Sequence, residues 1–306
     1  MEIIKGGVTA AKGYEAASTA AGIKYQGRTD MAMIYSQVPC AAAGTFTTNV
    51  VKAAPVKWDQ QVVKNGTPVQ AVIVNSGIAN ACTGAEGFGY CRDTAKAAAE
   101  ALGIAEDGVL IGSTGVIGKQ IPIDRLTAGI HALSKVKNDT LENGTAAAKA
   151  IMTTDTSEKE LAVTIEVGEK TVTIGGMAKG SGMIHPNMCT MLAFITTDAV
   201  ISKEVLQSAL SEDVNDTYNM ISVDGDTSTN DTVILLANGL AENPEIVYGS
   251  EEYHRFKDAL HTIDEYLAKK IAGDGEGATA LFEVQAVGCE SVEQAKTLAK
   301  SIVCSN

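Results

Sequence analysis

The sequence predicts a layered α+β fold rather than a parallel, doubly wound sheet. Segments with strand character cluster before residue 80 and again between residues 161 and 197, and segments with helical character are grouped separately from them. No internal repeat, low-complexity tract or Pro/Gly/Ser-rich linker interrupts the 306 residues. Such a chain is long enough for one large or two medium domains with a substantial core, and nothing in it marks a flexible hinge.

The first half of the chain is expected to contain three strands followed by three helices. Length and β-branched content predict strands at 31–35, 42–47 and 69–75. Helical spacing or alanine content predicts helices at 87–102, 124–134 and 140–152. Gly103 supplies a C-terminal stop for the first helix, and Asp124 suits the N-cap of the second.

The second half is expected to begin with a hairpin. Two strand-like segments, 161–167 and 170–174, flank Gly168 and Glu169, and a two-residue connection is typical of a tight hairpin. Further strands are predicted at 191–197, 232–237 and 280–287. Further helices are predicted at 202–215, 253–272 and 291–303.

Composition argues against several classes of function. The net charge of −13 and the pI near 4.8 disfavour binding to nucleic acid or to anionic membranes, which both attract basic surfaces. No apolar run approaches the roughly 20 residues that span a bilayer, and the first seven residues resemble neither a signal nor a transit peptide. The six cysteines include no CxxC pair and the four histidines lack metal-ligand spacing, so neither disulfides nor a metal site is expected. We predict a cytoplasmic protein.

The most informative segment is KGSGMIHPNMCT at 179–190, a glycine-rich stretch that leads into an apolar strand. Cleavage between Cys189 and Thr190 would make the threonine a new N-terminus. Its α-amino group, with a pKa of roughly 8, would then accept the proton of its own hydroxyl. Thr190 is therefore a candidate nucleophile, although the residues alone leave open an ordinary junction between a loop and a strand.

Three further features suit acyl transfer, which needs an oxyanion site and contacts to substrate. The segment GSTGVIG at 112–118 is expected to form a turn whose backbone amides stabilise a developing negative charge. Lys179 offers a cation for a substrate carboxylate. Glu276, in a glycine-rich loop with Asp274 as its local competitor, offers a carboxylate for a substrate ammonium group. Each feature is also open to a purely structural interpretation.

Six separated motifs, together with the 179–190 segment, resemble the ornithine acetyltransferase family, the bifunctional glutamate N-acetyltransferases of arginine biosynthesis. The motifs are NSGIANACTG at 75–84, GSTGVIG at 112–118, MTTDT at 152–156, GGMAKG at 175–180, SVDGDTSTND at 222–231 and DGEGAT at 274–279. The chain departs from the family in two places. Cys189 replaces the usual alanine, and the family continues beyond the last predicted helix, so this chain is expected to lack the family's C-terminal region.

The resemblance implies an α-β-β-α sandwich shared with self-processing aminopeptidases. It also implies an alpha chain of residues 1–189 and a beta chain of residues 190–306, which associate as a heterotetramer with two copies of each. Thr190 is then the nucleophile, and Thr114 and Gly115 form the oxyanion hole. The implied substrate contacts are Thr153, Lys179, Thr190 and Glu276. Thr154 stays an alternative to its neighbour, and a structural turn is an equal alternative for Asn230 and Asp231.

The activity implied by the resemblance is ping-pong acetyl transfer. The donor N-acetylornithine leaves as ornithine, and glutamate accepts the acetyl group to become N-acetylglutamate. No cofactor is implied, although some members of the family also take acetyl from acetyl-CoA. Two alternatives stay open, namely an aminopeptidase or amidase with an N-terminal nucleophile on the same fold, and an uncleaved binding protein without catalytic activity.

Overall fold

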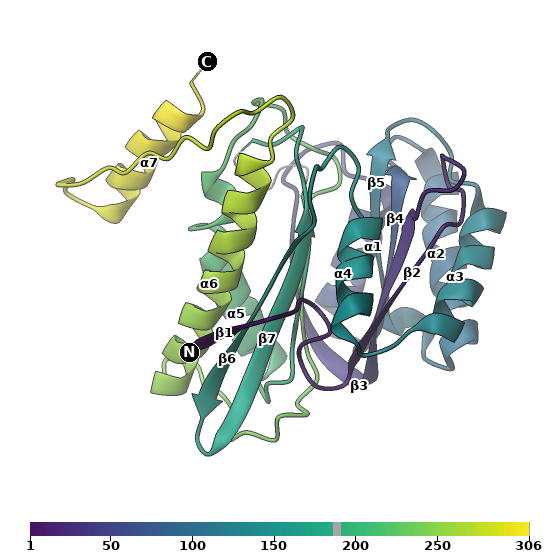
Figure 1. Ribbon diagram of the computed structural model, residues 1–306, viewed down its shortest axis with the longest axis horizontal. Helices are drawn as coiled ribbons and strands as arrows, with labels where there is room; N and C mark the ends of the chain where they lie inside the picture. Colours follow the sequence, from purple (N-terminus) through teal and green to yellow (C-terminus); the bar gives the residue numbers. More distant parts are fainter. Residues whose placement is uncertain (186–190, 306) are drawn as a thin grey trace.

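The structure, a computed structural model, describes residues 1–185 and 191–305, and in them two sheets face each other (Figure 1). The first sheet contains β1 (Glu2–Ile4), β6 (Lys159–Val167), β7 (Lys170–Lys179), β8 (Leu192–Thr197) and β9 (Thr232–Ala237), in that order. The second contains β2 (Tyr14–Thr19), β4 (Val69–Ile78) and β5 (Val109–Val116). The strand β3 (Met31–Phe46) belongs to both.

β3 explains why two strands were expected where the structure has one. Its first part pairs antiparallel with β2 and β4, and the register then shifts between Tyr35 and Cys40. From Ala41 onward the same strand pairs with β9 in the other sheet. The polar residues around Gln37 therefore mark a change of sheet within a continuous strand. The predicted hairpin at Gly168 is confirmed as the connection from β6 to β7.

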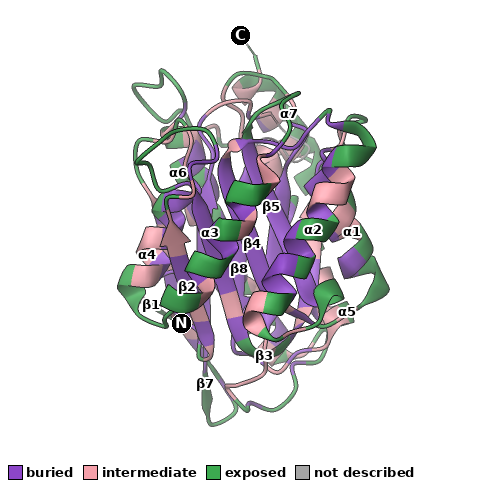
Figure 2. Ribbon diagram, turned by 90° about the vertical axis from the view of Figure 1, so that its right-hand side faces the viewer, coloured by how far each residue is buried: buried purple, intermediate pink, exposed green. Residues whose placement is uncertain are grey.

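Helices cover the outer face of each sheet, which confirms the α-β-β-α sandwich (Figure 1). The helices α5 (Lys203–Val214) and α6 (Glu251–Gly273) pack on the first sheet. On the second sheet lie α1 (Ala54–Asn65), α2 (Gly84–Leu102) and α3 (Ile123–Val136). The helix α4 (Leu141–Ala150) contacts strands of both sheets and closes one side of the core between them. Figure 2 shows the buried strands behind the partly exposed α2 and α3.

The longest helix illustrates how a local pattern becomes a packed layer. In α6, Phe256, Leu260 and Ile263 recur at three- and four-residue spacing and are fully buried against the first sheet. Its N-terminus is capped by the Ser250 hydroxyl, which accepts a hydrogen bond from the Tyr253 amide at 3.1 Å. This helix was predicted correctly because its apolar stripe is a local signal, whereas the Ser250 cap was not predicted.

Three expectations were wrong. Asp124 is not the N-cap of α3, because that helix begins at Ile123 and Pro122 occupies the cap position. Residues 280–287 form no strand, and Leu281 and Phe282 are exposed in an irregular segment that leads to α7 (Val292–Val303). The expected turn at 112–118 is instead mostly strand, because the parallel pairing of β4 with β5 continues as far as Ile78 and Val116. The helix α1 was not predicted at all. No helix in the described parts of the chain is long and apolar enough to cross a bilayer.

Candidate active site

Five residues expected to serve catalysis or substrate binding line a single cavity of about 360 Å³. They are far apart in sequence and come from four different segments. Thr114 and Gly115 lie near the end of β5, Thr153 follows α4, Lys179 ends β7, and Glu276 lies in the loop after α6. Their convergence is a tertiary result, because no pair except Thr114 and Gly115 is local.

The expected oxyanion segment depends on a close approach of two strands. In the parallel pairing of β4 with β5, Ser76 is opposite Thr114 and Gly77 is opposite Gly115. Gly115 has a φ of +127°, and a Cβ atom built on it would lie 2.3 Å from the carbonyl carbon of Gly77. Only glycine fits there without displacing β4, since both the φ angle and the space exclude a larger residue.

Lys179 is almost completely buried beside this segment. Its Nζ donates to the Thr114 hydroxyl at 3.4 Å and lies 3.9 Å from the Asp155 carboxylate. Desolvation by burial lowers the pKa of Lys179, and the negative charge of Asp155 opposes that effect. Lys159, a second cation nearby, lowers the pKa further. A buried ammonium group that faces the cavity is suited to pairing with a carboxylate or a developing oxyanion.

The loop that follows Lys179 is anchored from three sides. The Asp155 carboxylate accepts a hydrogen bond from the Gly180 amide at 2.7 Å, and Asp224 accepts from the Ile184 amide at 3.0 Å. The Ser181 carbonyl accepts from the Glu276 amide at 2.5 Å. Because Lys179 in β7 pairs with Leu192 in β8, the chain leaves and re-enters the sheet at the same end. Cys189 and Thr190 lie outside the described residues.

Asn230 and Asp231, for which a direct role and a structural turn were equal alternatives, make hydrogen bonds within the protein. The Asn230 amide nitrogen donates to the carbonyls of Ala79 at 2.7 Å and Ser113 at 2.8 Å, so it joins the ends of β4 and β5. Asp231 accepts from the Met191 amide at 3.0 Å. Desolvation raises the pKa of the Asp231 carboxyl well above its usual value. Asn230 thus braces the oxyanion segment, and Asp231 fixes the start of β8.

Glu276 and Asp274, the two carboxylates considered for binding a substrate ammonium group, have different surroundings in the structure. Glu276 lines the cavity, whereas Asp274 accepts hydrogen bonds from Lys159 at 2.6 Å and from the Thr156 amide at 3.0 Å. Asp274 therefore stabilises the loop rather than facing the cavity. The pair Thr153 and Thr154 is not separated in this way, because both line the cavity.

Sequence reasoning missed several residues at the site. Arg28 lines the cavity and donates to the carbonyls of Met152 at 2.6 Å and Thr153 at 3.1 Å, although the 20–30 segment carries no motif. Ser76 also lines the cavity, and its hydroxyl donates to the Ala150 carbonyl at 2.8 Å. Asp155 was within reach of prediction, because it lies in the MTTDT motif.

The two-sheet sandwich covered by helices on both faces defines a fold class, a variant of the Ntn-hydrolase fold. The chain matches, with a TM-score of 0.51, the l-aminopeptidase d-Ala-esterase/amidase from Ochrobactrum anthropi, whose structure is reported as a new variant of that fold. That match covers 90% of each chain at 12% identity, so it supports the fold alone.

Within that class, the chain belongs to the ArgJ family, whose model matches residues 15–306. It is 52% identical to the arginine biosynthesis bifunctional protein ArgJ of Symbiobacterium thermophilum over 100% of this chain and 76% of that protein. It is also similar to the crystal structure of ornithine acetyltransferase from Mycobacterium tuberculosis complexed with ornithine, with 42% identity and a TM-score of 0.55. That match covers 60% of this chain and 97% of the solved chain. The chain is thus an amino-acid acetyltransferase by family.

Proposed function

We propose that this chain transfers the acetyl group of N-acetylornithine to glutamate through an acetyl-Thr190 intermediate. The Thr190 oxygen attacks the acetyl carbonyl carbon, the carbon–nitrogen bond breaks, and ornithine leaves with the proton from the hydroxyl. The amine of glutamate then attacks the ester carbon, and the threonine oxygen leaves and regains a proton. Both half-reactions use one pocket, because both substrates are amino acids.

The same nucleophile is proposed to mature the chain. The Thr190 hydroxyl attacks the Cys189 carbonyl carbon, the peptide bond becomes an ester, and water hydrolyses it to give chains 1–189 and 190–306. The match to the solved ornithine acetyltransferase supports this division, because that chain is matched almost completely by 60% of this one. Residues 1–189 make up a similar share, 189 of 306 or about 62%. A heterotetramer with two copies of each product, located in the cytoplasm, completes the proposal.

One observation carries the proposal, namely the convergence of Thr114, Gly115, Thr153, Lys179 and Glu276 on one cavity at the end of β7. The Thr114 hydroxyl and the Gly115 amide are assigned to the oxyanion. Thr153 and Lys179 are assigned to the α-carboxylate of the substrate, and Glu276 to an ammonium group. This set supplies opposite charges for an amino acid in a partly buried space.

The activity is tested by incubating the protein with N-acetylornithine in the presence and absence of glutamate. We expect N-acetylglutamate and ornithine in equal amounts when glutamate is present. Release of acetate at the same rate without glutamate would instead indicate the amidase alternative. Replacing N-acetylornithine by acetyl-CoA tests the second donor, whose use stays a prediction.

Processing is tested by the intact mass of the purified chain and by N-terminal sequencing. We expect two polypeptides, the second of which begins with Thr190. Thr190→Ala should remain in one piece and be inactive, and Thr190→Ser should retain some cleavage because it keeps a hydroxyl. A folded wild-type protein that shows only Met1 as its N-terminus would contradict processing and favour the binding-protein alternative.

A further inference from the structure

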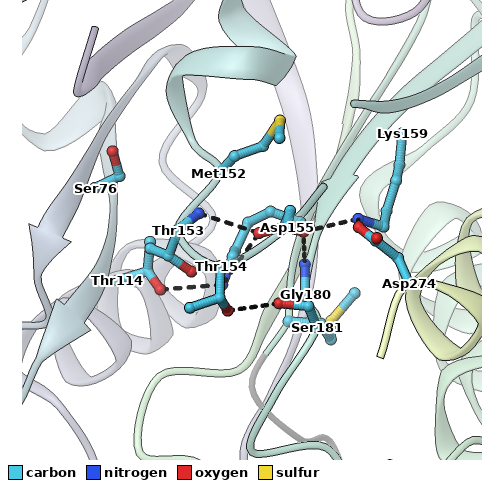
Figure 3. Close-up of polar contacts among 12 residues, drawn as sticks. Ser76, Thr114, Met152, Thr153, Thr154, Asp155, Lys159, Gly180, Ser181 and Asp274 are labelled. Atoms are coloured by element: carbon cyan, nitrogen blue, oxygen red, sulfur yellow. Dashed lines mark hydrogen bonds and ion pairs between the residues drawn. The ribbon is translucent and has the colours of Figure 1, made fainter. Parts of the chain in front are cut away.

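Asp155 occupies a position that the proposed reaction does not yet explain. Its carboxylate is completely buried and is surrounded by four donors from separate parts of the site. One oxygen accepts from the Lys159 Nζ at 2.8 Å and the Gly180 amide at 2.7 Å. The other accepts from the Thr153 amide at 3.1 Å and lies 3.9 Å from the Lys179 Nζ. Figure 3 shows Asp155 in contact with the segment after α4, with Gly180 and with Lys159.

Lys159 extends this contact to the far side of the site. Its side chain is completely buried, and its Nζ lies 2.6 Å from a carboxylate oxygen of Asp274 as well as 2.8 Å from Asp155 (Figure 3). Asp274 is two residues before Glu276, whose amide is bonded to Ser181 in the loop that follows β7. The four charged groups therefore alternate in sign along one line, Lys179, Asp155, Lys159 and Asp274, and we call them the buried charge row.

The row balances charges that burial would otherwise make costly. Desolvation acts to raise the pKa of Asp155, but Lys179 and Lys159 outweigh it and hold that pKa below its usual value. Three charged groups act on Lys179, each from a different element. Asp155 after α4 and Asp231 before β9 favour its protonated form, and Lys159 on β6 disfavours it. Asp274 joins the row through its ion pair with Lys159.

We propose that Asp155 is a positioning residue that keeps Lys179 protonated and directed at Thr114, and that Lys159 and Asp274 couple this ammonium group to the loop of Glu276. This inference rests on the proposed function, because it assigns the row to the substrate contacts of the same reaction. In the proposed cleaved protein, Asp155, Lys159 and Lys179 lie in residues 1–189 and Asp274 lies in residues 190–306. The row would therefore join the two products at the site.

Two substitutions of opposite electrostatic effect test the proposal. Asp155→Asn keeps the shape and an acceptor oxygen but removes the negative charge nearest to Lys179. Lys159→Gln removes the like charge and keeps a donor. If Lys179 acts as a cation, it sets the basic limb of the pH dependence of kcat/KM for N-acetylornithine. We expect this limb to move to lower pH by about one unit or more in Asp155→Asn and to higher pH in Lys159→Gln.

Asp274→Asn is the matched control, because it removes one charge of the row that does not contact Lys179 directly. Its basic limb should coincide with that of the wild type, whereas its KM should rise as the Glu276 loop loses a contact. A loss of packing alone would lower activity at every pH in all three variants and would leave the limb in place. Basic limbs that stay unchanged, or that move the same way in Asp155→Asn and Lys159→Gln, would overturn the proposal.

A second measurement reads the lysine without any need for activity or cleavage. The ¹³Cε resonance of Lys179, assigned by its absence in Lys179→Arg, is followed against pH in the folded wild type and in each variant. We expect the same opposite displacements of its midpoint, and coincident midpoints would refute the role of Asp155. If the wild type transfers no acetyl group while these midpoints move as expected, the proposed function fails and the buried charge row stands. If the wild type transfers acetyl groups and the midpoints do not move, the proposed function stands and the role of the buried charge row fails.

Discussion

Replacing Gly115 by alanine should both destabilise the protein and disable the oxyanion segment. A Cβ at this position would lie 2.3, 2.5 and 2.7 Å from the carbonyl carbon, the oxygen and the Cα of Gly77. Ordinary van der Waals contact begins at 3.4 Å, so β4 and β5 would have to separate by about 1 Å. Neither strand yields easily, because Asn230 bonds to the backbone of both strand ends.

The expected magnitude has two parts. An alanine held at the φ of +127° costs roughly 1–3 kcal/mol in backbone strain, and insertion of a methyl group into a filled space costs about 1–3 kcal/mol more. We therefore expect the free energy of unfolding to fall by about 2–6 kcal/mol. A displacement of about 1 Å at the reacting groups should also slow acetyl transfer by about a hundredfold.

Gly118→Ala is the matched control. Gly118 also has a positive φ, +77°, but nothing lies within 4 Å of the Cβ that would be added. Gly118→Ala should therefore lose free energy of unfolding through backbone strain alone, by roughly 1–2 kcal/mol. Urea unfolding and acetyl-transfer kinetics of both variants separate strain from the clash. If Gly115→Ala matches Gly118→Ala in stability and turns over like the wild type, the close approach of Gly77 and Gly115 has no catalytic importance.

Three other outcomes are expected. Thr114→Ala and Lys179→Ala should each slow acetyl transfer by about a hundredfold in fully cleaved enzyme, and wild-type kinetics in both would leave these residues a structural role only. Burial raises the pKa of Asp264 far above its usual value, so its native form retains a proton and the wild type loses stability as pH rises above about 4. Asp264→Asn still accepts a hydrogen bond from the Tyr218 hydroxyl and should flatten this pH dependence in urea unfolding. An unchanged pH dependence in the variant would contradict a protonated, buried Asp264. Tyr14→Phe loses the hydrogen bonds that the hydroxyl donates to a carbonyl of β8 at 3.2 Å and to a carbonyl of β9 at 2.9 Å. Its free energy of unfolding should therefore fall by about 1–3 kcal/mol, which thermal or urea denaturation would detect.

Much of the fold could be predicted because its signals are local. The apolar stripe of α6 and the tight connection at Gly168 are written in neighbouring residues, and both appear in the structure where they were expected. The strand predicted at 280–287 is absent because strand formation depends on more than local sequence. An alternating apolar segment becomes a strand only where a partner strand pairs with it, and no partner pairs with it among the described residues.

The candidate site also combines features that the sequence predicts with features that depend on the tertiary structure. The sequence by itself determined which residue types were available, namely a glycine-rich segment before Thr190, the GSTG segment, Lys179 and an acidic loop at 274–276. It also determined the family, because these motifs occur together and in order. Thr190 and Cys189 remain predictions, since they lie outside the described residues.

Only the tertiary structure decided which of these residues meet and what each one contacts. It directed Glu276 to the cavity and Asp274 to Lys159, a difference that the sequence of the Asp-Gly-Glu segment does not reveal. It also placed the Asp155 carboxylate 3.9 Å from the Nζ of Lys179, which lies 24 residues further along the chain. The physical reason is that burial and charge pairing depend on distances in space, and strand pairing brings those groups together only after the chain has folded.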